Sequence, residues 1–211
     1  MRIITISREF GSGGRELGKR IADILGFDYY DREIITAISQ AQGLNEDYVE
    51  NVLDNHAWQA VPITFRRSFS AATVMGSPQI PLLLEQKKVI EGIAKAENDC
   101  IIVGRNADVI LKNYNPFRIF VCADNEAKIK RCMERTGDGE ALTHRQLEQN
   151  MRQIDRNRVK TCEMVGGGKW GAPINYDLTV NTTDWEIKLL APAVAEFAAL
   201  WFGGKNADSI I

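Results

Sequence analysis

The chain has 211 residues, of which 45% are apolar and 26% are charged, as in ordinary soluble proteins with a sizeable core. Its net charge of -2 gives no basis for bulk binding to nucleic acid or to an anionic membrane. The four cysteines have no paired short spacing, which argues against a zinc site or a disulfide framework.

The expected location is the cytoplasm. The apolar run at the N-terminus is too short for a signal peptide, and no apolar stretch approaches the roughly 20 residues of a membrane span. We therefore expect a single domain, residues 1–211, with neither nucleic acid nor membrane as a partner.

Strand patterns and helix patterns alternate along the chain. Short apolar runs predict strands at 3–6, 27–31, 100–105, 117–121 and 176–181. Helices are predicted at 17–25, 32–56, 82–97, 106–112, 143–164 and 185–202, with a charged helix after residue 124. The segment 32–56 is broken at Gly43-Leu44-Asn45, so it is expected to form two helices. This alternation is typical of an α/β three-layer sandwich, in which helices cover both faces of a parallel sheet.

Local signals refine these elements. Asn45 and Thr143 are expected helix caps, and Gln146 follows Thr143 at the capping-box position. Residues 56–81, interrupted by prolines, indicate an irregular or helical insertion beside the sheet. In the charged helix, Lys128 and its charged neighbours are expected mostly on the solvent side.

A glycine-rich loop follows the first strand. It contains Gly11-Ser12-Gly13-Gly14 and leads into the first helix. Strand, glycine-rich turn and helix is the arrangement in which backbone amides surround a phosphate at the positive end of a helix. A turn without a ligand is the alternative, but such a turn rarely needs so many glycines. We therefore predict phosphate binding at this loop.

Other candidate residues also follow strands. Ligands of parallel sheets bind beyond the carboxyl ends of the strands, and Asp31 and Arg105 follow the second and third strands. Arginine suits bidentate contact with phosphate, and the candidates are Arg8, Arg15, Arg105, Arg156 and Arg158. A solvated helix face is the alternative interpretation for any single arginine.

Several segments of the chain resemble a known family. The matching segments are 7–16, 27–31, Gly104-Arg105-Asn106, Asp155-Arg156-Asn157-Arg158, and Lys169-Trp170-Gly171 with the following Tyr176-Asp177-Leu178. In these segments the chain resembles the cytidylate kinase-like proteins, a branch of the P-loop nucleoside monophosphate kinases. The combination is fairly specific for the branch and much less so for its substrate.

The resemblance implies an adenylate-kinase-like P-loop fold with five parallel strands. It also implies an acceptor-binding insertion at 46–81 and an arginine-bearing lid at 143–172. The implied reaction transfers the γ-phosphoryl group of ATP, with Mg²⁺, to a nucleoside monophosphate, and CMP or dCMP is the first guess.

The resemblance further implies roles for individual residues. Asp31, Arg105 and Asp155 would hold the acceptor, Arg15, Arg156 and Arg158 would be catalytic, and Glu16 would bind Mg²⁺. The residues implied to bind the ATP phosphates are Arg8, Gly11, Ser12, Gly13, Gly14, Arg15 and Glu16.

The loop departs from the usual pattern G-x-x-x-x-G-K-[ST]. With Gly13 at the second glycine, Arg8 stands at the first, Gly14 replaces the lysine and Arg15 replaces the hydroxyl residue. Asn106 also replaces the aspartate of the family's Gly-Arg-Asp element. These changes leave the expected fold intact and weaken the catalytic prediction.

Two further functional interpretations therefore stay open. One is a non-catalytic, nucleotide-binding protein, a degenerate kinase that has lost turnover. The other is a kinase with a different small-molecule acceptor, because no residue pattern in the insertion matches cytosine. A homo-oligomer is also open, since Trp185, Trp201 and Phe202 on the last helix can form either core or a partner face.

Overall fold

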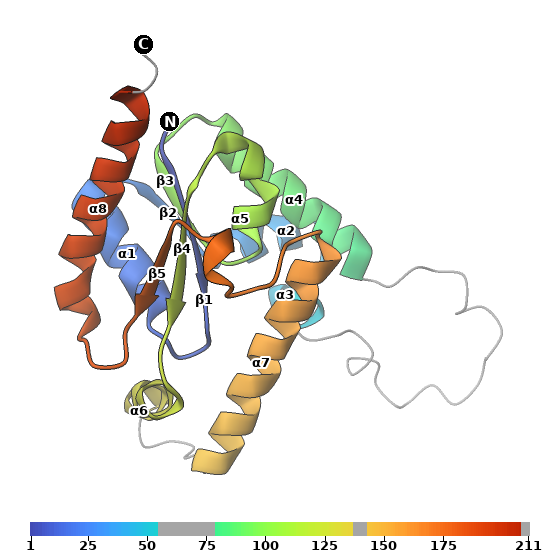
Figure 1. Cartoon of the computed structure of the whole chain (residues 1–211). Helices are drawn as coiled ribbons and strands as arrows, with labels where there is room; N and C mark the ends of the chain where they lie inside the picture. The colour runs from blue at the N-terminus through green and yellow to red at the C-terminus, as the bar shows by residue number, and fades with distance from the viewer. Residues whose placement is uncertain (55–78, 137–142, 208–211) are drawn as a thin grey trace.

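The computed structural model describes residues 1–54, 79–136 and 143–207. Its centre is a five-stranded sheet with the strand order β2-β3-β1-β4-β5, in which all neighbouring strands are parallel. The strands are β1 (Ile3–Arg8), β2 (Asp28–Tyr30), β3 (Cys100–Val103), β4 (Phe117–Cys122) and β5 (Leu178–Asn181) (Figure 1).

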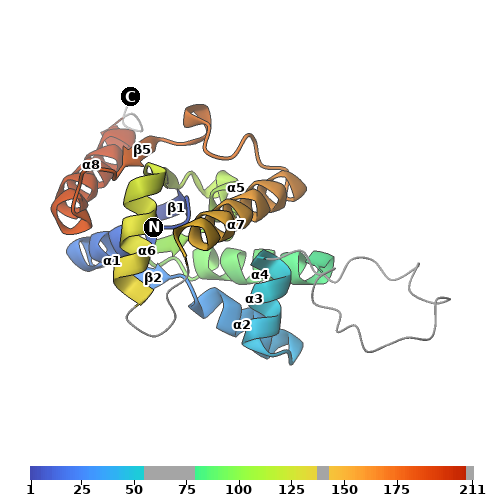
Figure 2. The ribbon, with the colours of Figure 1, turned by 90° about the horizontal axis from the view of Figure 1, so that it is seen from below.

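Helices cover both faces of the sheet, which confirms the predicted α/β three-layer sandwich. One face packs against α1 (Gly14–Leu25) and α8 (Ile187–Ala207). The other packs against α2 (Glu33–Gln42), α3 (Glu46–Asp54), α4 (Gln79–Lys95) and α5 (Ala107–Ile110). Short 3-10 helices occupy Lys112–Tyr114 and Pro173–Asn175. Beyond the carboxyl ends of the strands lie α6 (Asn125–Thr136) and α7 (His144–Met164) (Figures 1 and 2).

Strand β1 shows why the apolar run near the N-terminus predicted a buried strand. Ile4 and Ile6 belong to the core on the α1 and α8 side, whereas Ile3 belongs to the core on the α2 and α4 side. Side chains alternate across a strand, and a central parallel strand is covered on both faces, so it needs apolar residues at successive positions. The strand continues beyond the predicted run to Arg8, which fixes the start of the glycine-rich loop.

Both predicted helix caps are confirmed. The Asn45 side chain accepts hydrogen bonds from the backbone amides of Asp47 and Tyr48, at 2.9 and 3.3 Å. Thr143 and Gln146 form a reciprocal capping box at the start of α7. Of the predicted insertion at 46–81, residues 55–78 lie outside the described residues, so the insertion stays a prediction.

Helix α8 corrects one expectation. Within the described part of the chain, its segment Ile187–Gly204 is long and apolar enough to cross a membrane, judged by length and composition alone. The expectation that no stretch approaches such a span was wrong, because a helix that covers a sheet is also rich in apolar residues. The Trp201 and Phe202 rings lie 5.0 and 6.3 Å from the Phe117 ring of β4, so both pack against the core, where they are partly buried. Trp185 is 55% exposed.

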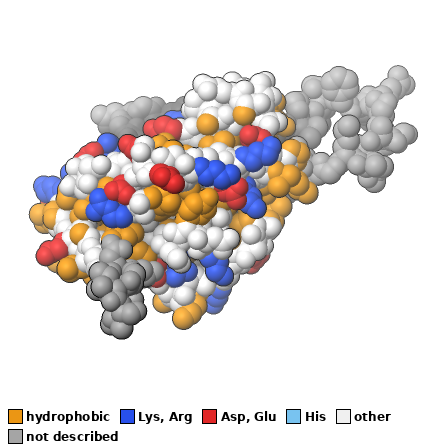
Figure 3. Space-filling view, turned by 90° about the horizontal axis from the view of Figure 1, so that it is seen from above, with side chains coloured by type: hydrophobic (Ala, Val, Ile, Leu, Met, Phe, Trp, Pro, Cys, Tyr) orange, Lys and Arg blue, Asp and Glu red, His pale blue; other side chains and the backbone are white. Residues whose placement is uncertain are grey.

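The surface charges are mixed. On the face seen in Figure 3, the described lysines and arginines alternate with aspartates and glutamates, and no extended area carries one sign. This agrees with the net charge of -2.

Candidate functional site

The glycine-rich loop joins β1 to α1 at the carboxyl end of the central strand. Gly11 and Gly13 have φ angles of 77° and 83°, and a Cβ atom at Gly13 would lie only 2.6 Å from Cδ1 of Ile187. Gly13 precedes α1 without a side-chain capping bond, and the first amides of a helix have no acceptor within it. The loop therefore presents backbone donors at the positive end of α1, as an anion site requires.

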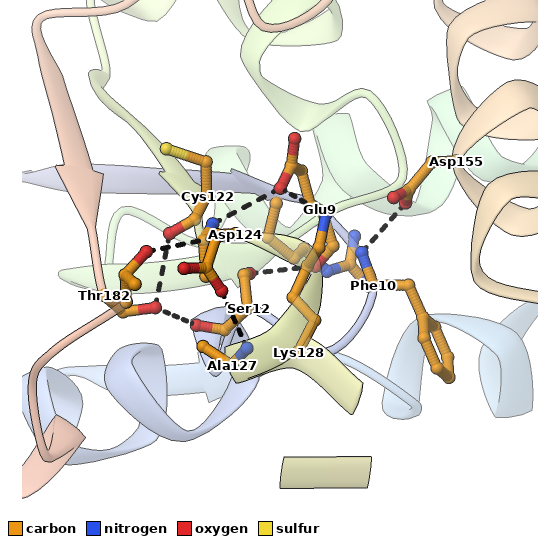
Figure 4. A network of polar contacts seen from close by, with 12 residues as sticks. Glu9, Phe10, Ser12, Cys122, Asp124, Ala127, Lys128, Asp155 and Thr182 are labelled. Carbon is orange, nitrogen blue, oxygen red and sulfur yellow. Dashed lines mark hydrogen bonds and ion pairs between the residues drawn. The ribbon is translucent and has the colours of Figure 1, made fainter. Parts of the chain in front are cut away.

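Ser12 braces this loop from inside. Its side chain is buried and donates a hydrogen bond to the carbonyl oxygen of Glu9 at 2.8 Å. The carbonyl oxygen of Ser12 accepts one from the Thr182 hydroxyl at 2.7 Å (Figure 4). The Ser12 hydroxyl is thus committed to the loop itself, and the residue is suited to contact a ligand through its backbone.

Three arginines meet beyond the ends of β1 and β3. Arg8, Arg105 and Arg158 line one small cavity of about 50 Å³, together with Gln86 and Asn157; we call it the arginine cleft. The Arg8 and Arg105 side chains are 13% and 9% exposed. The convergence of Arg8, Arg105 and Arg158 suits a small, strongly anionic ligand.

Carboxylates balance each of these arginines. The shortest nitrogen–oxygen distances are 3.8 Å from Arg8 to Asp31, 3.9 Å from Arg105 to Glu50, and 2.9 Å from Arg158 to Asp155. Buried guanidinium groups need such partners. A ligand phosphate would therefore share the arginines with carboxylates that already hold them in place.

Gly104 gives the Arg8 side chain its room. Its φ angle is 76°, and a Cβ atom there would overlap the Arg8 guanidinium. The next two residues, Arg105 and Asn106, also have left-handed φ angles of 56° and 55°. Such backbone is strained for residues other than glycine. This turn brings Arg105 into the cleft, where Gln86 donates a hydrogen bond to its carbonyl oxygen at 2.9 Å.

Arg15 and Glu16 of the loop lie apart from the arginine cleft. The Arg15 side chain is 57% exposed and forms an ion pair with Asp31 from the outer side. Glu16 pairs with Arg20 at 2.9 Å. Both line a shallow outer cleft beside α1. Arg15 is connected to the arginine cleft through Asp31, because Asp31 also forms an ion pair with Arg8. The predicted Mg²⁺ role of Glu16 stays a prediction.

Arg156 and Arg158 face two different clefts, although both were predicted to close over the same phosphates. Arg158 lines the arginine cleft and donates to the carbonyl oxygen of Arg8 at 2.9 Å. Arg156 lines a separate cleft of about 330 Å³ with Lys128, Arg152 and Asp155, which we call the lysine cleft. Two residues on a helix are about 200° apart around its axis, so α7 turns these side chains to opposite sides.

Asp155 links α7 to the loop. Its carboxylate accepts a hydrogen bond from the Phe10 amide at 2.8 Å (Figure 4). It accepts another from Arg158 at 2.9 Å. Burial raises the pKa of Asp155, whereas the Arg158 charge and the Phe10 amide lower it. Asp155 therefore lies at the loop and beside a cleft arginine, consistent with a ligand-binding region.

Sequence reasoning missed the pair formed by Glu9 and Lys128. Lys128 was expected on the solvent side of its helix, but it is only 7% exposed. Its ammonium contacts the Glu9 carboxylate at 2.9 Å, and that carboxylate also accepts a bond from the Ala123 amide at 3.3 Å. The available signal was that Lys128 shares a helix face with Cys132, four residues on.

The described residues offer suitable groups for the phosphates of ATP, but they contain no cluster of metal-binding side chains for Mg²⁺. The amides at the start of α1 and the nearby arginines suit phosphate oxygens. For Mg²⁺, the described residues contain no group of three or more His, Cys, Asp or Glu side chains arranged to hold a metal ion.

Comparisons with known proteins agree with the fold. The model of the cytidylate kinase-like family matches residues 3–184. An uncharacterized protein from Eubacterium ventriosum has a TM-score of 0.66 at 22% identity, covering 94% of this chain and 99% of that one. Comparison with curated proteins gives no match.

Two solved kinases are also similar. A shikimate kinase from Acinetobacter baumannii, in complex with shikimate, has a TM-score of 0.54 at 12% identity, covering 93% of this chain and 92% of that one. A gluconokinase from Sinorhizobium meliloti has a TM-score of 0.58 at 11% identity, covering 99% and 97%. At such identities the likeness shows the fold alone.

Proposed function

The chain belongs to the cytidylate kinase-like family, and we propose that it is an ATP-dependent kinase for a small anionic acceptor. CMP or dCMP is the first acceptor to test. The observation that carries this proposal is the arginine cleft, where Arg8, Arg105 and Arg158 converge beside the glycine-rich loop. A phosphate-bearing acceptor is the ligand whose charge this set matches best.

In this proposal the donor lies along the loop. The amides at the start of α1 bind the phosphates of ATP, with Gly11 and Gly13 allowing the close approach of the backbone. Mg²⁺ bound to the nucleotide supplies charge neutralisation at the transferred phosphoryl group. The protein's own contribution is then position and electrostatic stabilisation.

The arginine cleft orients the acceptor toward the loop. Arg105, held by the turn after β3, binds the acceptor's phosphate, and Asp31 positions Arg8 and Arg15 through its ion pairs. An acceptor oxygen attacks the γ-phosphorus, the bond to the bridging oxygen of ADP breaks, and ADP leaves. Charge on the transferred group is stabilised by Arg8 and Arg158, which are both fixed at the end of β1.

A cavity of about 50 Å³ is too small for a nucleoside monophosphate, which occupies several hundred cubic ångströms in typical ligand pockets. The cavity must widen to admit the whole acceptor, and in this proposal α7, which contributes Ile154, Asn157, Arg158 and Thr161 to its lining, moves away from the strand ends and then closes, a common step in kinases. Closure excludes water, which protects the phosphoryl group from hydrolysis.

Two alternatives each have one supporting observation. Gly14 in place of the loop lysine supports a nucleotide-binding protein without turnover. The likeness to a shikimate kinase and a gluconokinase supports an acceptor that is not a nucleotide. The enclosed arginines and the family membership favour a kinase over the first alternative.

One assay separates these functions. Purified protein with Mg-ATP is incubated with each nucleoside monophosphate, with shikimate and with gluconate, and ADP formation is followed against a reaction without acceptor. We expect turnover with CMP or dCMP above that background. Turnover with only shikimate or only gluconate would show that the acceptor is that compound and not a nucleotide. Nucleotide binding without any turnover would establish the non-catalytic alternative.

A further inference from the structure

The Arg8 side chain leaves no room for a lysine at position 14 of the glycine-rich loop. A Cβ atom at Gly14, where the usual loop has its lysine, would lie 2.6 Å from Cβ and 3.0 Å from Cγ of Arg8. These atoms are next to the Arg8 backbone, so a change of rotamer cannot move both away. Arg8 itself stands where the usual loop has its first glycine. The arginine at position 8 and the glycine at position 14 are therefore coupled replacements of the usual loop residues. The Arg8 side chain fills the space that a side chain at position 14 would need.

Helix α6 brings a lysine to the same loop from outside. The carbonyl oxygen and Cβ of Lys128 would lie 3.0 and 3.1 Å from a Cβ atom at Gly11, so the helix packs directly on the loop. Lys128 is 7% exposed, which is rare for lysine. Its ammonium is held 2.9 Å from the Glu9 carboxylate. A buried cation therefore lies beside the phosphate-binding loop.

Carboxylate oxygens occupy two donors of this region. Glu9 accepts from Lys128, and Asp155 accepts from the Phe10 amide at 2.8 Å (Figure 4). A carboxylate oxygen resembles a phosphate oxygen in charge and in hydrogen-bond geometry. The lysine cleft beside these donors measures about 330 Å³ and carries two further cations, Arg156 and Arg152, the latter in an ion pair with Glu148. The donors are thus arranged for anionic oxygens, next to a space that is open to a larger ligand.

We propose that Lys128 supplies the ammonium that the loop lacks and binds the terminal phosphates of the donor nucleotide. This rests on the proposed function, since it takes ATP to bind along the glycine-rich loop. Phosphate oxygens then replace Glu9 at Lys128 and Asp155 at the Phe10 amide. In this protein, α6 therefore provides the ammonium group that the loop after β1 provides in the usual pattern.

Calorimetric binding of ADP and of inorganic tripolyphosphate, at fixed salt, tests this assignment. Lys128→Met is expected to weaken both ligands by about 10- to 100-fold, the usual effect of losing a charged hydrogen bond. Lys128→Arg keeps the charge and loses less. The matched control is Lys130→Met, which removes an exposed lysine of the same helix and leaves both affinities unchanged. Wild-type affinities in a folded Lys128→Met protein would overturn the assignment.

Glu9→Gln separates ligand binding from a purely structural ion pair. It keeps an oxygen for the Ala123 amide and removes the charge that competes with phosphate for Lys128. The affinity for tripolyphosphate should rise by about two- to fivefold. A structural pair predicts a lower melting temperature and no gain in affinity, and that result would also overturn the assignment, even if Lys128→Met does not fold.

The outcome is distinguishable from a failure of the proposed function. Tripolyphosphate binding that depends on Lys128, without phosphoryl transfer to any acceptor, would support the assignment and refute the kinase. Phosphoryl transfer that is unaffected by Lys128→Met would refute the assignment and support the kinase. Wild-type protein that binds neither ADP nor tripolyphosphate would refute both.

Discussion

The arginine cleft and the lysine cleft lie on two sides of α7 and hold their cations differently. In the arginine cleft, Arg8 and Arg105 are 13% and 9% exposed around about 50 Å³. In the lysine cleft, Lys128 is also buried, but Arg152 is 65% exposed and the space is about 330 Å³. Enclosed guanidinium groups can fix the orientation of a small anion. Exposed guanidinium groups mainly attract the anion toward the protein, and salt screens this attraction.

Helix α7 makes the two clefts interdependent. Asp155 contacts the loop amide of Phe10 on one side and Arg158 on the other, and Arg156 follows Asp155 into the lysine cleft. A displacement of α7 therefore changes both clefts at once. Orientation in one cleft and charge capture in the other are the two roles that the following variants separate.

The largest expected effect is that of Arg158→Ala, which removes an enclosed cation of the arginine cleft. We expect kcat to fall by roughly 10²- to 10³-fold, the range for losing one donor that stabilises a transition state. The assay is ADP formation with the best acceptor. Arg145→Ala, an exposed position on the same helix, is the control and should retain full turnover. Wild-type turnover in Arg158→Ala would remove the catalytic role from this cleft.

Gly104→Ala should break the arginine cleft without removing a charge. A Cβ atom there overlaps the Arg8 guanidinium, so Arg8 must leave its position, and we expect at least a roughly tenfold loss of kcat/KM. The matched control is Gly26→Ala. Gly26 has a similar φ angle of 68°, and a Cβ atom added there would meet nothing within 4 Å.

Left-handed backbone strain should cost both glycine variants about 1 kcal/mol of unfolding free energy, measured by urea unfolding, and Gly104→Ala should lose more because it also displaces the enclosed Arg8 side chain. Only Gly104→Ala should also lose activity. Equal activity losses in the two variants would mean that backbone strain, and not the position of Arg8, limits the reaction.

A smaller effect is expected from Arg156→Ala, which removes an exposed cation of the lysine cleft. The KM for ATP should rise by about two- to fivefold with little change in kcat, because an exposed charge contributes modestly. Steady-state kinetics at 50 and 300 mM salt would check this, since the difference from wild type should shrink at the higher concentration, roughly as charge screening requires. A fall in kcat as large as that of Arg158→Ala would show that the two clefts do not divide their roles.

The smallest effect concerns pH. Burial raises the pKa of Asp155 above its usual value of 3.8, so between that value and the raised pKa the folded protein binds more protons than the unfolded chain. Asp155 therefore lowers stability as the pH rises through this window. Asp155→Asn removes that loss, so its stability relative to wild type should be greater at pH 7 than at pH 4, measured by urea unfolding. A relative stability that is the same at both pH values would contradict the raised pKa.

Much of the fold was predictable from local patterns. The apolar run of β1, the glycines after it and the caps at Asn45 and Thr143 are short-range signals, because strand burial, turn geometry and capping each depend on a few neighbouring residues. Alternating strands and helices then predicted the parallel sheet, and parallel strands bring Asp31 and Arg105 to the same edge. Both residues lie beside Arg8 or its partners, as that argument requires.

The candidate site was less predictable. Sequence spacing put Arg156 and Arg158 in one motif, but it could not say that the arginine cleft lies on only one side of α7. It likewise marked Lys128 as one charge among many on a hydrophilic helix. Its burial depends on the packing of α6 against Gly11, a contact between residues more than a hundred positions apart.

The sequence by itself determined a glycine-rich, phosphate-type loop whose lysine is missing, because residue types at fixed spacing decide what a short loop can bind. Only the tertiary structure decided why the lysine is missing and what lies nearby instead. Arg8 fills the space above Gly14, Gly104 admits the Arg8 guanidinium, and Lys128 approaches from α6. These are steric and electrostatic relations between distant segments, and they arise only when the sheet brings those segments together.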